Sequence, residues 1–235
     1  MNLTKKDKVI IFAAHPDDEV LGCGGTIAKL RKKGVQVYIY FFAEGISSRY
    51  KSNKVKSLIV KKKIKERNKN ALNALKVLNV NKKNIFFENL ECCKLDTYGL
   101  LYLTKKAEEI IKKVKPSTIL THSPNDINND HILVNEAVLA AIRPLPKSTV
   151  KRILFFEVMS SSEWNTLKVF KPNVFSDITS FFNAKIKSLM KYKNEIYKNN
   201  HPRSKHGITG LAIYRGSQIS VKYAEGFQLF RGKLD

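Results

Sequence analysis

Short apolar runs alternate with longer amphipathic stretches over the first two thirds of the chain. The short runs are rich in β-branched and aromatic residues and are bounded by turn residues, which is typical of buried parallel strands. They lie at residues 8–14, 35–43, 84–87, 117–121 and 152–158. The longer stretches have the three- and four-residue spacing of amphipathic helices. They lie at residues 20–33, 56–78, 98–113 and 130–142. Gly34, Pro116 and Pro144 stand where three of these helices should end.

This alternation predicts an α/β fold with an open, mostly parallel sheet and helices on both of its faces. Ligands of such folds bind beyond the carboxyl ends of the strands. The last part of the chain differs, because residues 181–197 predict an amphipathic helix, residues 207–215 a further helix, and residues 223–230 a last segment. We expect residues 1–235 to form a single domain in which this last part is a C-terminal cap.

The composition is strongly basic, with 43 Lys and Arg against 20 Asp and Glu and a net charge of +23. The excess is mostly lysine, whereas nucleic-acid sites favour arginine with interleaved aromatic residues. We therefore expect no nucleic-acid partner, but a lysine-rich surface that also attracts an anionic substrate.

Three further features concern location and redox state. No apolar run reaches 18 residues, so a membrane span is not expected. The polar start of the chain leads into a short apolar run without a small-residue cleavage site, and this favours a cytoplasmic location. The three cysteines, Cys23, Cys92 and Cys93, show no zinc-type spacing and include an adjacent pair, so we expect reduced thiols.

The first predicted strand ends in a cluster of histidine and carboxylate side chains. His15 and Asp18 form a good zinc-ligand pair, and this leaves Asp17 free for another task. Carboxylates are also stabilised near a helix N-terminus. A helix cap formed by Asp17, Asp18 and Glu19, with His15 incidental, is therefore an alternative.

Three glycines follow this cluster, at positions 22, 24 and 25. Each glycine inside a helix costs about 1 kcal/mol relative to alanine. Their presence indicates that the backbone packs closely here or approaches a ligand. The spacing does not match a dinucleotide-binding loop.

A second cluster follows the strand at residues 117–121. It contains His122, Asp126, Asn128, Asp130 and His131. Because parallel strands deliver their carboxyl ends to one edge of a sheet, we expect both clusters to lie together. His131 would complete a zinc site with three protein ligands and an open position for water. Asp126 and Asp130 are candidates to orient the ligands.

Residues 14–19, Ala-His-Pro-Asp-Asp-Glu, together with residues 126–131 resemble the PIG-L/LmbE family of zinc-dependent de-N-acetylases. The resemblance also covers residues 43–49, Glu157, residues 160–164 and residues 201–204. It implies a Rossmann-like fold. It also implies the hydrolysis of an N-acetyl group on an amino sugar or sugar conjugate, which releases acetate and a free amine.

The resemblance assigns zinc binding to His15, Asp18 and His131, and the role of general base to Asp17. Many members have histidine at the position of Asn128, which can donate a hydrogen bond but cannot carry a proton. His201 and His122 are candidates to replace that acid, although each is also readily explained as a surface or structural residue. We expect His206 to lie on the surface.

Four residues are candidate substrate contacts: Arg49, Glu44, Trp164 and Arg203. Arg49 is equally well explained as an ordinary surface arginine, and Trp164 as a core residue. A site of two histidines and one aspartate also accepts Fe²⁺ or Co²⁺ in place of Zn²⁺.

Two other functions stay open. One is amide hydrolysis on a thiol–sugar or non-sugar conjugate, and the other is a basic binding protein that has lost catalysis through Asn128. Oligomerisation is compatible with each of these functions.

Overall fold

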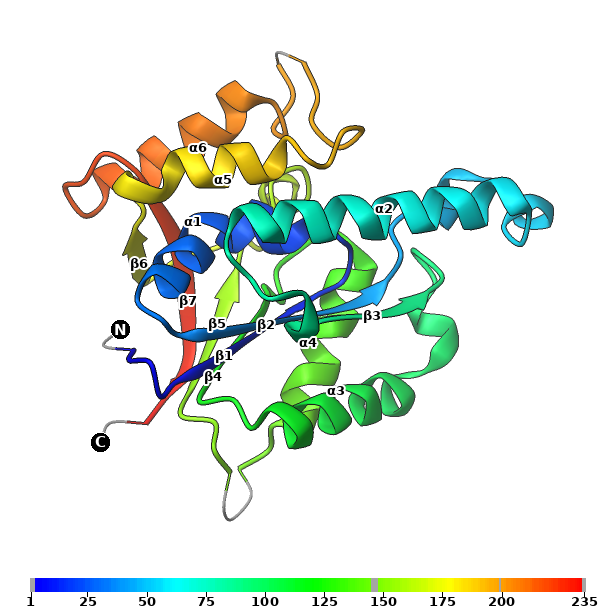
Figure 1. Ribbon diagram of the computed structural model, residues 1–235, viewed down its shortest axis with the longest axis horizontal. Helices are drawn as coiled ribbons and strands as arrows, with labels where there is room; N and C mark the ends of the chain where they lie inside the picture. The colour runs from blue at the N-terminus through cyan, green and yellow to red at the C-terminus, as the bar shows by residue number, and fades with distance from the viewer. Residues whose placement is uncertain (1–2, 145–147, 199, 234–235) are drawn as a thin grey trace.

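A computed structural model describes residues 3–144, 148–198 and 200–233, and these contain a seven-stranded sheet (Figure 1). The strands are β1 (Lys8–Ala13), β2 (Gln36–Ala43), β3 (Ile85–Leu90), β4 (Thr118–His122), β5 (Arg152–Phe156), β6 (Val174–Asp177) and β7 (Ala224–Gly232). Their order across the sheet is β3-β2-β1-β4-β5-β7-β6. Strands β1 to β5 are parallel, whereas β7 runs antiparallel to both β5 and β6.

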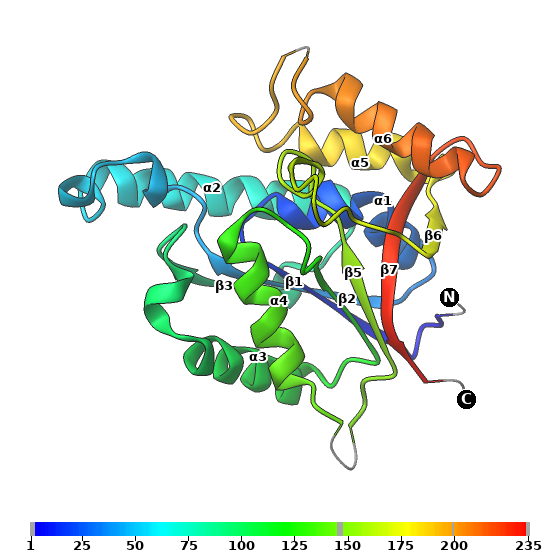
Figure 2. The same cartoon turned by 180° about the vertical axis from the view of Figure 1, so that it is seen from behind.

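Helices cover both faces of the sheet. They are α1 (Asp18–Lys32), α2 (Leu58–Val77), α3 (Leu100–Val114), α4 (Asn129–Ala141), α5 (Phe182–Leu189) and α6 (Lys205–Ser217). Figures 1 and 2 show α1, α2 and α5 on one face, and α3 and α4 on the other. Among the described residues, no helix is long and apolar enough to cross a membrane.

The core has two layers because successive side chains of a strand point to opposite faces. Val9 and Ile11 of β1 pack beneath α1 and α2, while Ile10 and Phe12 pack against α3 and α4. All four side chains have no exposed surface. A strand that is buried on both faces is apolar throughout, and this explains the uninterrupted runs in the sequence. The predicted mostly parallel α/β fold is confirmed.

The C-terminal part differs from the prediction in two respects. Strand β6 was not predicted, and the helix expected over residues 181–197 ends at Leu189. The chain then forms turns that place Tyr192 in the core and bring Glu195 to Arg67 of α2. A continued helix would not satisfy these long-range contacts, which sequence periodicity does not report.

Helix α2 buries one face, which includes Ala71 and Leu75, but the apolar residues at its start are not part of it. Leu58 and Ile59 at its start are 83% and 68% exposed, although their apolar character suggested burial. The buried stripe instead includes Val60, Arg67 and Leu75, which are spaced by whole helical turns.

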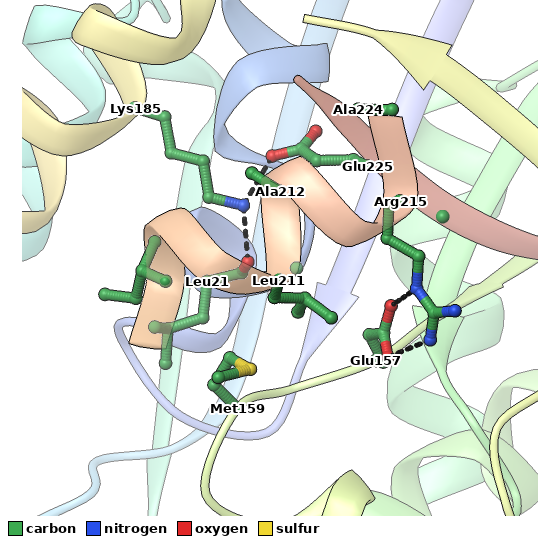
Figure 3. A pocket seen from close by; sticks show the side chains of 12 residues that line it. Leu21, Glu157, Met159, Lys185, Leu211, Ala212, Arg215, Ala224 and Glu225 are labelled. Carbon is green, nitrogen blue, oxygen red and sulfur yellow. Dashed lines mark hydrogen bonds and ion pairs between the residues drawn. The ribbon is translucent and has the colours of Figure 1, made fainter. Parts of the chain in front are cut away.

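The C-terminal cap is joined to α1 by buried polar contacts (Figure 3). The Lys185 ammonium group donates to the Leu21 carbonyl at 2.7 Å and to the Glu225 carboxylate at 2.6 Å. Glu225 also accepts from the backbone amides of Gly25 and Thr26 at 2.9 and 2.7 Å. The cavity between these elements measures about 10 Å³, which is room for one water molecule at most.

The glycines of α1 are explained by this close packing. A Cβ atom on Gly22 would lie 2.5 Å from the Phe156 ring, and one on Gly25 would lie 2.7 Å from Ile178. These positions require glycine because the helix lies directly against β5 and the cap. Of the two explanations left open by the sequence, close backbone packing is therefore the one that the contacts support.

Candidate active site

The two histidine–aspartate clusters meet at the carboxyl edge of the sheet. Strands β1 and β4 are neighbours, and α1 and α4 begin just beyond their ends. This brings together His15, Asp18 and His131, whose ligand atoms lie within 4.8 Å of one another. All three side chains are buried. The group predicted as the metal-ligand set is thus assembled in space.

His131 is oriented by Asp126. Its Nδ1 lies 3.2 Å from an Asp126 oxygen, while its Nε2 lies 3.4 Å from Asp18 Oδ2. Asp126 in turn accepts hydrogen bonds from the hydroxyl groups of Ser161 and Ser162 at 2.9 and 2.7 Å. A carboxylate on one ring nitrogen leaves the other nitrogen to face a metal.

His15 has an equivalent partner in Asp130. Its Nε2 lies 2.9 Å from Asp130 Oδ2, and its Nδ1 lies 3.5 Å from Asp18 Oδ2. Asp130 also accepts from the backbone amides of Cys93 and Leu95 at 2.7 and 3.3 Å. Asp126 and Asp130 therefore lie where carboxylates that orient the ligands should lie.

These residues fit a divalent metal ion. Within the described part of the chain, the Nε2 atom of His131 and the Oδ1 atom of Asp18 are buried without a hydrogen-bond partner. Buried polar atoms are rarely left unpaired. Burial favours the neutral carboxyl, but the nearby His131 and His15 hold the pKa of Asp18 well below its ordinary value. Two imidazoles and one ionised carboxylate are a common donor set for Zn²⁺.

The Asp17 carboxylate is held by two arginines. Its Oδ2 accepts from Arg203 at 2.8 Å and lies 2.9 Å from the Arg67 guanidinium. Burial raises the pKa of Asp17 above its ordinary value, and the pull of the two arginines toward the ionised form offsets this only in part. The backbone φ angle is 136°, a strained value for a non-glycine residue. Such strain is held in place by the surrounding structure and is frequent at functional sites.

The sequence patterns do not predict Arg67 and Glu195 as residues of the candidate site. Arg67 is 5% exposed and pairs with both Asp17 and Glu195, while Arg49 pairs with Glu195 at 2.9 Å. One signal was available for Arg67, since it lies on the same stripe of α2 as Ile64 and Ala71. An arginine on an apolar stripe needs a buried partner. For Glu195 the sequence holds no such signal, because its contact with Arg67 depends on the turns that replace the end of the helix expected over residues 181–197.

Asn128 and His122 have clear structural roles. Asn128 is the N-cap of α4, and its Oδ1 accepts from the Asp130 amide at 3.0 Å, so its amide NH₂ group is the part that can donate elsewhere. His122 Nε2 accepts from the Ala14 amide at 2.8 Å, and its ring stacks on His131. Burial and the adjacent His131 hold the pKa of His122 well below its ordinary value. These contacts favour a structural His122 over an acid.

His201 and Trp164, the candidate acid and a candidate substrate contact, lie near each other. His201 stacks on Tyr197 with ring centroids 4.1 Å apart, and it contacts the edge of Trp164 at 6.4 Å. Trp164 is 53% exposed, so its alternative role as a core residue is wrong. His201 is half-buried, and its Nδ1 accepts from the Arg203 amide at 3.0 Å. His206 is exposed, as expected.

The remaining substrate candidates are engaged with the protein itself. Both oxygens of Glu44 accept from backbone amides, including those of Ser47 and Cys92. Arg203 donates to Asp17, and Arg49 pairs with Glu195. Glu44 is buried, and these contacts favour a role in shaping the loops. Direct substrate contact by the three residues stays a prediction.

The chain is similar to several known deacetylases. The profile of the PIG-L family, described as GlcNAc-PI de-N-acetylase, matches residues 10–142, more than half of the chain. The uncharacterised deacetylase YaiS of Escherichia coli (strain K12) is 28% identical over 199 residues, which cover 81% of this chain and 92% of that protein. A probable N-acetyl-alpha-D-glucosaminyl L-malate deacetylase 2 of Bacillus subtilis (strain 168) is 30% identical over 166 residues, 67% of this chain and 71% of that protein.

The fold has a solved counterpart. The N,N'-diacetylchitobiose deacetylase from Pyrococcus horikoshii superposes with a TM-score of 0.77 at 24% identity, covering 96% of this chain and 84% of that chain. The parallel sheet and the histidine–aspartate group at its edge define an α/β protein with a candidate metal centre. The chain belongs to the PIG-L family of de-N-acetylases. The family predicted from the two motifs is thereby confirmed.

Proposed function

We propose that this chain is a zinc-dependent hydrolase that removes the N-acetyl group of an amino sugar or sugar conjugate. The observation that carries the proposal is the convergence of His15, Asp18 and His131, with unpaired buried ligand atoms, close to the strained Asp17. The similarity to an N-acetylglucosaminyl malate deacetylase supports a sugar conjugate as the substrate.

In this proposal His15, Asp18 and His131 hold the ion, and Fe²⁺ or Co²⁺ are substitutes for Zn²⁺. When bound, such an ion polarises a carbonyl oxygen and lowers the pKa of a water molecule to about 7. Asp126 and Asp130 fix the two imidazole rings by holding the nitrogen that does not face the ion.

Asp17 acts as the general base that takes a proton from the attacking water. Arg67 and Arg203 hold its carboxylate in one orientation, so that the free oxygen can face the reacting water. The Asn128 amide can donate to the oxygen of the acetyl carbonyl as negative charge develops on it.

The leaving amine must receive a proton before acetate and the free amine separate. Asp17 can return the proton that it took, which requires no further acid. His201 is the alternative donor, since its half-buried ring lies in the segment that carries Arg203. The pH profile of a His201→Ala variant separates these two routes, because only the second depends on this imidazole.

The direct test is to measure acetate release from a panel of N-acetylated substrates, with metal analysis of the same sample. The panel contains free N-acetylglucosamine, a glycoside with an anionic aglycone, and a simple N-acetyl amide without a sugar. Release that is confined to the sugars and proportional to zinc content is expected. Release from the simple amide as well as from the sugars would favour a broader amidase, and no release from any compound would favour a binding protein.

A further inference from the structure

A second group of metal-binding side chains lies on the other side of His15. The ligand atoms of His15, Cys92 and Asp130 lie within 4.8 Å of one another, and all three residues are buried. The Cys92 sulfur lies 3.8 Å from the sulfur of Cys93, which is exposed. A thiol, an imidazole and a carboxylate thus converge next to the candidate active site, and a second thiol lies beside the first.

The backbone holds these cysteines in place. The Cys92 amide donates to Glu44 at 3.1 Å and to the Ser47 hydroxyl at 2.9 Å, while the Cys93 amide donates to Asp130 at 2.7 Å. Cys93 has a φ angle of 58°, the left-handed conformation, and this turns its side chain next to that of Cys92. The group is therefore preorganised, and the exposed Cys93 provides an entry path for an ion.

A disulfide is a poor alternative for this pair. The Cα atoms of adjacent residues are about 3.8 Å apart, below the roughly 4.4–6.8 Å span of ordinary disulfides. The thiols are instead available as soft ligands, which favour ions such as Zn²⁺, Cu⁺ and other thiophilic metals.

We propose that Cys92, Cys93, Asp130 and the Nε2 atom of His15 form a second, inhibitory site for a thiophilic metal ion. Binding replaces the two thiol protons with two sulfur–metal bonds and releases both protons to the solvent, with no transfer of electrons. The Nε2 proton of His15 moves to Nδ1 as the ring changes tautomer.

The two sites exclude each other through His15. A neutral imidazole offers a single nitrogen lone pair, since its other nitrogen carries the proton. The Nδ1 atom of His15 faces Asp18, and the Nε2 atom faces Asp130. An ion that takes Nε2 therefore leaves a protonated Nδ1 toward the first site and removes one of its three ligands. This inhibition rests on the proposed function, whereas the binding itself does not.

The binding test uses chelator-treated protein titrated with Cd²⁺, whose bonds to thiolates absorb in the ultraviolet. We expect a thiolate–cadmium band in the unaltered chain. Cys92→Ser should weaken this binding by at least about 10-fold, because even the loss of a residue that only hydrogen-bonds to a metal ligand lowers metal affinity by about that much. Cys23→Ala is the matched control, because Cys23 is buried but outside this group. The same band with the same affinity in Cys92→Ser, or no band in the unaltered chain, would overturn the proposal.

Alkylation gives a second measurement that does not depend on the absorption band. Cd²⁺ should protect Cys93 from iodoacetamide in the unaltered chain but not in Cys92→Ser, as measured by mass spectrometry. Equal protection in both would contradict the shared site.

With the zinc-loaded protein, Cd²⁺ should inhibit acetate release less in Cys93→Ser than in the unaltered chain. If the protein releases no acetate from any substrate, the proposed function fails, while the absorption and alkylation results still decide the second site.

Discussion

Asp17 combines a strained backbone with a carboxylate held by two guanidinium groups. Its N-cap position at α1 would normally direct the side chain to the first backbone amides of the helix. Instead the side chain makes no capping bond and pairs with Arg67 and Arg203. The residue therefore gives up a helix-stabilising contact to place a carboxylate beside the ligand group.

Replacing Asp17 with asparagine tests this role. General bases contribute about 10²–10⁴-fold to rate, so Asp17→Asn should lower acetate release by that order while zinc stays bound. Acetate release and elemental analysis are measured on the same preparation, with circular dichroism as the control for folding. Undiminished hydrolysis by the folded variant would remove Asp17 from the mechanism.

At the scale of elements, α2 carries a cation into the core. Arg67 lies on its buried face and pairs with Asp17 and Glu195, which come from segments far apart in the sequence. A buried charge that loses its partner is costly, and each of the two carboxylates depends on this arginine. Helix α2 thus connects the first turn after β1 to the segment that follows α5.

Removal of this charge should destabilise the fold. Arg67→Met removes the buried cation that Asp17 and Glu195 share and leaves them paired only with Arg203 and Arg49, so we expect a loss of up to about 3–5 kcal/mol in the free energy of unfolding. Urea denaturation measures it. Lys69→Met on the same helix is the matched control, because Lys69 is exposed and should change stability by less than about 0.5 kcal/mol. Equal stability of the two variants would mean that water or rearrangement replaces the guanidinium.

The elements show which features were predictable from the sequence. Strands β1 to β5 and the ligand group were predictable because each follows from a local pattern, in which an apolar run is followed by a short polar motif. Arg67, Glu195 and Cys92 act through contacts between segments distant in sequence, which local patterns do not encode. Strand β6 is only four residues long, Val174–Asp177, and too short to show periodicity.

At the scale of the whole molecule, the metal should act as a ligand of the folded state. At 100 times its dissociation constant, an ion that binds only the folded chain adds about 2.7 kcal/mol to stability. For a chain of this size, 1 kcal/mol shifts Tm by about 2–4 °C. We therefore expect Zn²⁺ to raise the Tm of chelator-treated protein by about 5–11 °C.

Differential scanning calorimetry with and without Zn²⁺ measures this shift. His131→Ala is the control, because it removes one ligand and should reduce the shift sharply. An unchanged Tm in the unaltered protein, or an equal shift in the variant, would show that the stabilising ion does not bind at this group.

The position of β7 has a consequence for how the protein matures on the ribosome. This strand follows the other six in sequence but pairs between β5 and β6, and Glu225 at its start joins the cap to α1. Arg203, which holds Asp17, lies in the segment just before α6. During synthesis His15, Asp18 and His131 are present long before these contacts can form. A nascent chain should therefore acquire the residues of the candidate metal site early and the Arg203 contact of Asp17 late, so that hydrolysis begins only after the segment from Arg203 to β7 has been synthesised.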